Sequence, residues 1–191
     1  MRSFIAADFP QEILQKIYKI TNYLKTQTPP RSVKWVDSKN LHLTVKFMGD
    51  LPEEKLSAAQ PLIQDALEGI APFTFSVEGL GMFPNPGYPR VIWLGIQGGE
   101  PLVAIHKSLE QTLTDIGVKR DKRNFHPHLT LGRVRRNVPR DEIEAIGETL
   151  SQFRVGSLGS AMINQITLYE SELTRQGPIY KSRCVVTLHQ V

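Results

Sequence analysis

Two short stretches decide the architecture of this chain. They are Leu41–Val45 (LHLTV) and, in the other half of the sequence, Pro127–Leu131 (PHLTL), and each reads histidine, apolar, threonine, apolar. Alternate side chains of an extended strand share a face, so the histidine and threonine of each stretch point one way and the apolar residues the other. The apolar face favours helices packed against it, and the histidine–threonine face is left to line something polar.

The elements around these stretches occur in the same order in both halves. Apolar residues keep helical spacing over 13–24, 56–70, 102–116 and 143–153. Apolar or alternating runs predict strands at 4–7, 33–36, 41–47, 73–77, 91–96, 129–131, 162–168 and 180–188. Each half therefore runs helix, strand, helix, strand, strand, which indicates an internal duplication. We expect one domain over 1–191, built from two related lobes of about 1–98 and 99–191 that share a face and are free to exchange strands.

Several single residues have a plain structural interpretation. Asp8, followed by Pro10 and Gln11, is typical of a helix start with Asp8 as N-cap. His106 follows Ile105 in an amphipathic helix, and we expect it to be exposed. Four aromatic residues could stack on a base, but we expect each to pack in the core or at the lobe junction: Trp35, Phe47, Tyr88 and Trp93.

Composition excludes several classes of protein. Hydrophobic residues make up 40% and charged residues 22% of the 191 residues, as in an ordinary globular protein. Cys184 is the single cysteine, so neither an intrachain disulfide nor a thiolate-rich zinc or iron–sulfur site can form. No apolar run approaches the roughly 18 residues of a membrane span, and Asp8 interrupts any signal-peptide core. We expect a cytoplasmic monomer without membrane contact.

The positive charge is concentrated in one stretch. The formal net charge is +4, but residues 119–140 hold eight lysines and arginines and one acid, Asp121. Such a stretch fits a polyanionic partner such as a phosphate or a nucleic acid. A solvated loop surface explains it equally well on charge alone.

The two histidines can act together if the lobes bring them face to face. Near pH 7 one imidazole can be neutral and the other protonated, so that His42 and His128 could take a proton from water and give one to a leaving oxygen. The hydroxyls of Thr44 and Thr130 can donate to phosphoryl oxygens.

A cation near this pair would stabilise negative charge in a transition state. Strand parity places Lys46 on the face of His42. Arg133 has the wrong parity relative to His128, so it reaches the same face only if the strand ends or bends at Gly132.

Metal and nucleoside triphosphate chemistry find little support. His126 and His128 could form a metal pair, but no third ligand lies close in sequence, and we expect no metal and no cofactor. Gly79, Gly81 and the pair at 98–99 lack the spacing and the lysine of a phosphate-binding loop, which argues against a kinase or an ATP-dependent ligase.

The same residues carry a family resemblance that spans nearly the whole chain. Trp35–Val36 and Asn40–Gly49 (NLHLTVKFMG), Phe125–Arg133 (FHPHLTLGR), Phe4–Ala6 and Phe83–Pro84 resemble the two-histidine (2H) phosphoesterases. Within that superfamily they are similar to the bacterial and archaeal RNA 2′,3′-cyclic phosphodiesterases, historically called 2′-5′ RNA ligases. One histidine–apolar–threonine motif is a weak signal, whereas two in matching halves are a strong one.

The resemblance implies an α+β fold of two pseudo-symmetric lobes around a central cleft, each an antiparallel sheet with helices on its outer face. It implies His42 and His128 as the acid–base pair, Thr44 and Thr130 as phosphate ligands, and Arg133 as the cation beside the phosphate. The implied reaction is metal-free hydrolysis of a terminal ribose 2′,3′-cyclic phosphate to a 2′-phosphate, with 2′-5′ ligation as its reverse.

The resemblance also implies the partners, which are RNA ends such as tRNA fragments, or small cyclic nucleotides. We assign His42 as acid and His128 as base if the 3′-oxygen leaves, and the roles reverse if the 2′-oxygen leaves. The alternative to an enzyme is a non-catalytic module that binds RNA ends in the same cleft.

Overall fold

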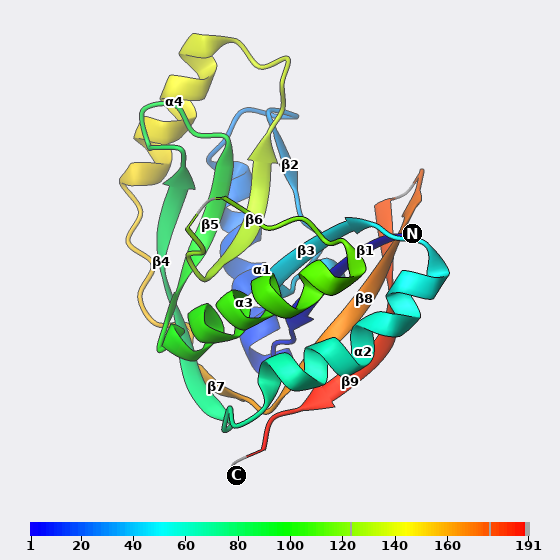
Figure 1. The fold of residues 1–191 in the computed structure, drawn as a ribbon. Coiled ribbons are helices and arrows are strands. Elements are labelled where there is room, and N and C mark those ends of the chain that lie inside the picture. Colours follow the sequence, from blue (N-terminus) through cyan, green and yellow to red (C-terminus); the bar gives the residue numbers. More distant parts are fainter. Residues whose placement is uncertain (123, 176, 190–191) are drawn as a thin grey trace.

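The computed structural model describes residues 1–122, 124–175 and 177–189, so Arg123 of the basic stretch lies outside the described residues. Within them, two antiparallel sheets form the framework (Figure 1). The four-stranded sheet has the order β3-β1-β8-β9, with β3 Leu43–Asp50, β1 Arg2–Ala7, β8 Gln165–Thr174 and β9 Gly177–Thr187. The five-stranded sheet has the order β2-β6-β5-β4-β7, with β2 Val33–Trp35, β6 His128–Val134, β5 Val91–Gln97, β4 Phe73–Phe83 and β7 Ser160–Ile163.

Helices cover one face of each sheet. The α-helices are α1 Gln11–Thr26, α2 Glu53–Leu67, α3 Glu100–Thr112 and α4 Arg140–Ser151, with short 3-10 turns η1 Ser38–Asn40 and η2 Leu113–Ile116. α2 and α3 contact each other and the four-stranded sheet, while α4 contacts β4 of the five-stranded sheet. α1 lies behind β5 and β6 in Figure 1. This arrangement confirms the predicted α+β fold of two lobes.

Neither sheet is made from one half of the sequence. β3 and β1 come from the first half, and β1 pairs with β8 from the second half. In the other sheet, β6 from the second half lies between β2 and β5 from the first half. The helices cross as well. α1 follows β1 of the four-stranded sheet but lies behind β5 and β6 in Figure 1, and α3 follows β5 of the five-stranded sheet but contacts β3. Each lobe is therefore built from elements of both halves of the sequence.

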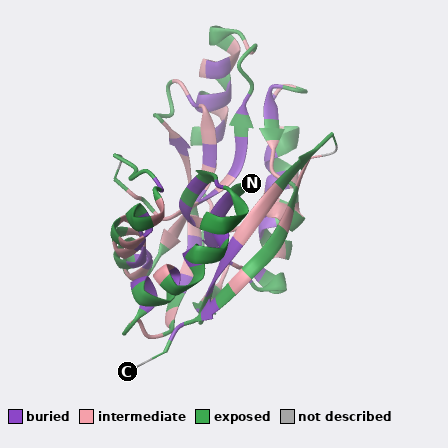
Figure 2. Ribbon diagram, turned by 45° about the vertical axis from the view of Figure 1, so that its right-hand side comes forward, coloured by how far each residue is buried: buried purple, intermediate pink, exposed green. Residues whose placement is uncertain are grey.

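The apolar stripes face inward as their spacing predicts. Ile13, Ile17 and Leu24 of α1 are buried, and buried residues gather where helices meet the sheets, whereas the far end of the β8–β9 hairpin is exposed (Figure 2). The burial of these apolar faces is the main force that holds helices on sheets. No described helix is long and apolar enough to cross a membrane.

The start of α1 differs from the expectation. The helix begins at Gln11 with Pro10 as N-cap and no side-chain cap, so the prediction that Asp8 caps it is wrong. The physical reason is competition for the carboxylate, because Asp8 accepts hydrogen bonds from β8 and from His42 instead. Proline suits this position, since the first amide groups of a helix have no acceptor within the helix.

Candidate active site

The two motifs lie on β3 and β6, which contact each other where the two sheets meet. His42 directly precedes β3, and His128 opens β6. Leu43 and Leu129 are buried, while Thr44 and Thr130 are half-buried. The side chains thus alternate as the motif predicts, with the leucines directed into the core.

Both strands carry a β-bulge at the same place in the motif. In the pairing of β3 with β1, Thr44 lies opposite Ala6 and Lys46 opposite Ile5, so the register skips Val45. In the pairing of β6 with β5 the register skips Leu131 in the same way. An extra residue reverses the alternation of faces beyond it. Each motif therefore continues with two buried residues and then one exposed residue, and these exposed positions are Phe47 and Arg133.

The bulge overturns the parity argument for Lys46. Lys46 is only 4% exposed and lies on the helix side of β3, where its ammonium group forms an ion pair with Glu110 of α3. Nζ also donates to the carbonyl oxygen of Lys119 at 2.9 Å. The prediction that Lys46 shares the face of His42 is wrong, because that prediction assumed a regular strand.

The equivalent β-bulge in β6 reverses the alternation of side chains, so that Arg133 falls on the same face of the strand as His128. The bulge falls at Leu131, one residue before the expected bend at Gly132. Arg133 is exposed, and its positive charge contributes to lowering the pKa of His128. A Cβ at Gly132 would come within 2.8 Å of Val33 and 3.0 Å of the Trp35 ring, so β2 packs directly over this glycine.

The imidazole of His42 is held by a carboxylate network. His42 Nδ1 donates to Asp8 Oδ1 at 2.8 Å. The Tyr169 hydroxyl donates to the same oxygen at 2.7 Å, and Thr167 donates to Oδ2 at 3.4 Å. Burial alone would raise the pKa of Asp8, but the hydrogen bonds from His42 and Tyr169 outweigh it and lower the pKa. Asp8 is therefore a carboxylate that orients the ring, as the acid of a catalytic triad does.

This arrangement leaves the other ring nitrogen of His42 for chemistry. Nε2 is buried and has no hydrogen-bond partner within the described residues. The ring lies against Tyr169 and Tyr180, with centroids 4.7 Å and 5.2 Å away. Burial raises the pKa of both phenols, and Asp8 raises that of Tyr169 further. Both therefore remain neutral near pH 7.

His128 is held by the backbone instead. Its Nδ1 donates to the carbonyl oxygen of His126 at 2.6 Å. Phe83 and Trp93 lie at steep angles to the ring, with centroids 5.1 Å and 6.1 Å away. Burial lowers the pKa of His128, and the charges of Arg133 and His126 lower it further. The hydrogen bond to the His126 carbonyl oxygen raises this pKa but does not outweigh them. His128 therefore favours the neutral form, which accepts a proton.

The aromatic residues divide between packing and exposure. Trp35 and Tyr88 pack against the core, and Trp93 lies over Gly81, where a Cβ would come within 2.1 Å of its ring. These placements confirm the expected packing role. Phe47 is different, because it is 63% exposed on the motif face of β3, and the prediction that it packs is wrong.

Sequence reasoning missed Asp8 as a site residue. β1 runs antiparallel to β3 with Ala7 opposite Leu43, so the next residue, Asp8, falls beside His42. The local signal was misleading, since an aspartate two residues before a proline is typical of a helix start. The pairing of β1 with β3 is the one signal that identifies it.

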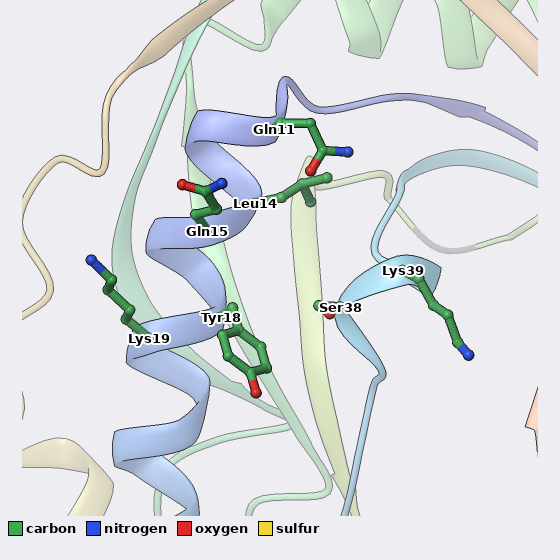
Figure 3. Close-up of a pocket in the computed structure, with 7 residues that line it drawn as sticks. All are labelled: Gln11, Leu14, Gln15, Tyr18, Lys19, Ser38 and Lys39. Carbon is green, nitrogen blue, oxygen red and sulfur yellow. The ribbon is translucent and has the colours of Figure 1, made fainter.

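One cavity among the described residues lies away from both motifs. It measures about 460 Å³ between α1 and η1, and it includes no motif residue. Figure 3 shows its lining by Gln11, Leu14, Gln15, Tyr18, Lys19, Ser38 and Lys39. Within the described residues, no three histidine, cysteine or acidic side chains lie together as a metal cluster.

Comparison with known proteins places this geometry in a family. Residues 10–174 match the family described as the 2′-5′ RNA ligase superfamily. An RNA 2′,3′-cyclic phosphodiesterase of Methanothermobacter thermautotrophicus is 39% identical over 181 residues, which cover 94% of this chain and 95% of that protein. One of Archaeoglobus fulgidus is 36% identical over 181 residues, covering 95% and 97%.

Solved structures agree with the sequence relatives. Escherichia coli LigT in complex with 3′-AMP has a TM-score of 0.77 at 27% identity, over 99% of this chain and 98% of that chain. A protein of Thermus thermophilus has a TM-score of 0.77 at 27% identity, over 100% and 99%. With its two motifs at corresponding bulges, the chain belongs to the 2′-5′ RNA ligase superfamily of 2H phosphoesterases.

Proposed function

We propose that this chain is an RNA 2′,3′-cyclic phosphodiesterase that hydrolyses a terminal ribose 2′,3′-cyclic phosphate to a 2′-phosphate without a metal ion. One observation carries the proposal: each motif histidine gives its Nδ1–H to a protein acceptor, which leaves Nε2 for the substrate. Two such groups on adjoining strands match the needs of acid–base catalysis at phosphorus. The names of the curated relatives support the same reaction.

The surroundings of the two histidines support a division of roles. The Asp8 carboxylate stabilises a positive charge on His42, so His42 acts as the acid. The lowered pKa of His128 suits a base. His128 Nε2 takes a proton from water, the water oxygen bonds to phosphorus, the bond from phosphorus to O3′ breaks, and His42 Nε2–H protonates O3′. The 2′-phosphate and a free 3′-hydroxyl remain.

The phosphate ligands follow from the shared face. We place the hydroxyls of Thr44 and Thr130 and the guanidinium of Arg133 on the nonbridging oxygens, where negative charge grows in the transition state. Lys46 is not part of this set, since its ammonium group is committed to Glu110. The exposed basic residues near 119–122 and 133–136 give a longer RNA side chains to contact with its phosphates beyond the terminal nucleotide.

Hydrolysis in EDTA of a short RNA that ends in 2′,3′-cyclic phosphate tests the proposal, with the phosphate position of the product determined. We expect a 2′-phosphate, and we expect His42→Ala and His128→Ala each to lower kcat by about 10³-fold or more while the fold is kept. The exposed His189 supplies the matched control, and His189→Ala should retain full activity.

Other outcomes redirect the proposal. A 3′-phosphate product would keep the chemistry but exchange the roles of the two histidines. Absence of product with RNA still bound would favour the non-catalytic RNA-end-binding module. Incubating the cyclic-phosphate RNA with a second RNA that begins with a 5′-hydroxyl tests ligation, whose product is a 2′-5′ linkage.

A further inference from the structure

His106 does not occupy the exposed position that its helix predicts. Its side chain is 13% exposed, and it points from α3 toward β3, where Nδ1 donates to the carbonyl oxygen of Val45 at 2.8 Å. The acceptor matters because Val45 is the residue that the register of β3 with β1 skips. β3 is also the edge of its sheet, so no other described strand pairs there. His106 therefore supplies a donor to the bulge of the first motif.

A face of the same ring contacts the segment that leads into the second motif. His106 stacks on Phe125 with a centroid separation of 4.4 Å and an interplanar angle of 12°. Phe125 precedes His126, whose carbonyl oxygen accepts from His128 Nδ1. A single imidazole thus lies between the strand of His42 and the backbone group that orients His128.

Glu110, one turn further along α3, secures the same junction. Its carboxylate pairs with Lys46 and accepts from the backbone amide of Asp121 at 2.9 Å, and it lies 3.5 Å from His106 Nε2. Lys46 in turn donates to the Lys119 carbonyl oxygen. The backbone at residues 119 and 121 is therefore held to β3 and α3.

We propose that His106 is a positioning residue that sets His128 relative to His42 by joining the bulge of the first motif to the approach of the second. This role rests on the proposed function. His106 takes no part in proton transfer: its Nδ1–H is used by Val45, and its Nε2 faces Glu110 on the helix side of the strand. The consequence of its loss is a misplaced base rather than a missing one.

Three substitutions at position 106 test the two contacts. His106→Ala removes both, His106→Asn keeps a donor in reach of Val45 but no ring, and His106→Phe keeps the stack on Phe125 but no donor. We expect His106→Ala to lower kcat about 10- to 100-fold, because an ångström of misplacement costs about that much. We expect KM to change less than about threefold, since the phosphate ligands on the strands remain. His106→Asn and His106→Phe should fall between the wild type and His106→Ala.

A matched control separates positioning from stability. Ile105→Val removes one methylene from the neighbouring, fully buried residue of α3 and should cost about 1 kcal/mol of stability. We expect it to lower Tm with kcat unchanged, whereas His106→Ala loses kcat at temperatures where it is fully folded. Both limbs of the pH–rate profile should keep their positions in His106→Ala, because neither catalytic histidine is replaced. Unchanged kcat in His106→Ala, or equal loss in Ile105→Val, would overturn the proposal.

A spectroscopic measurement keeps this test independent of turnover. In ¹H–¹⁵N spectra of the imidazole groups, we expect His106→Ala to shift or broaden the Nδ1–H signal of His128 and to leave that of His42 in place. An inactive wild type would refute the proposed function. The positioning role would then be tested by the spectra only. An unchanged His128 signal would refute that role.

Discussion

The strands β3 and β6 carry the same motif and the same bulge, yet they differ at nearly every position outside it. After the bulge β3 has Lys46 and Phe47, where β6 has Gly132 and Arg133. The histidine of the first is held by a carboxylate, and that of the second by a backbone carbonyl. The comparison teaches that a repeated backbone can place two like groups in unlike surroundings, which supports our proposal that one histidine is the acid and the other the base.

Breaking the buried ion pair of β3 should have the largest effect. Lys46→Met leaves the largely buried Glu110, whose side chain is 12% exposed, without its cation, which should cost about 3 kcal/mol in the free energy of unfolding. Denaturant titration measures this loss. The double variant Lys46→Met, Glu110→Gln should recover most of it, because no uncompensated charge remains. A double variant no more stable than the single one would mean that the ion pair is not the cause.

Replacing Arg133, the exposed cation of β6, should have the second-largest effect. Arg133→Gln removes charge stabilisation in the transition state, so we expect kcat/KM to fall about 10²- to 10³-fold. It also removes a positive neighbour of His128, which raises the pKa of that base. Because the base acts when deprotonated, the acidic limb of the kcat/KM profile should move to higher pH. Arg154→Gln, an exposed arginine beyond α4, should shift neither quantity.

Removing the carboxylate that distinguishes His42 from His128 should have a moderate effect. Asp8→Asn withdraws the negative charge that stabilises protonated His42, so we expect the alkaline limb of the profile to move to lower pH. The activity above neutral pH should fall about 10- to 100-fold. Tyr169→Phe, which removes one donor to Asp8 and keeps its charge, should change the profile much less. An acidic limb that moved instead would contradict the assignment of His42 as acid.

Truncating Phe47, which occupies the position in β3 that Arg133 occupies in β6, should have the smallest effect. Phe47→Ala removes an exposed aromatic face on the motif side of β3, and a base stacked there contributes about 1–3 kcal/mol. We expect KM for the RNA to rise about tenfold with kcat nearly unchanged, and Phe47→Tyr to behave as the wild type. A loss confined to kcat would place Phe47 with the phosphate ligands instead.

Local pattern predicted the frame of the site well. The four helices, most of the strands and both motifs follow from apolar spacing and strand alternation, since these depend on neighbours within a few residues. The details at element ends were less certain: the alternating run at 162–168 is divided between β7 and β8, and α3 ends at Thr112 with η2 following. These differences leave the motif strands in place.

The errors share one physical origin. The predictions for Lys46, Phe47 and His106 are wrong because they assume a regular strand and an exposed helix position. The skipped residue Val45 in β3 instead reverses the face and leaves a carbonyl oxygen to which His106 donates. The sequence within a few residues of Val45 does not predict that bulge. It forms where the register of β1 with β3 shifts, and the pairing of the whole sheet sets that register.

By itself the sequence determined the duplicated pattern, the α+β class and the two histidine–threonine pairs, because each is written in residues close along the chain. Only the tertiary structure decided that Asp8 orients His42, that Arg133 rather than Lys46 shares the motif face, and that His106 lies between the two motifs. Those relations join residues tens of positions apart. They arise from strand register and helix crossing, which no local periodicity specifies.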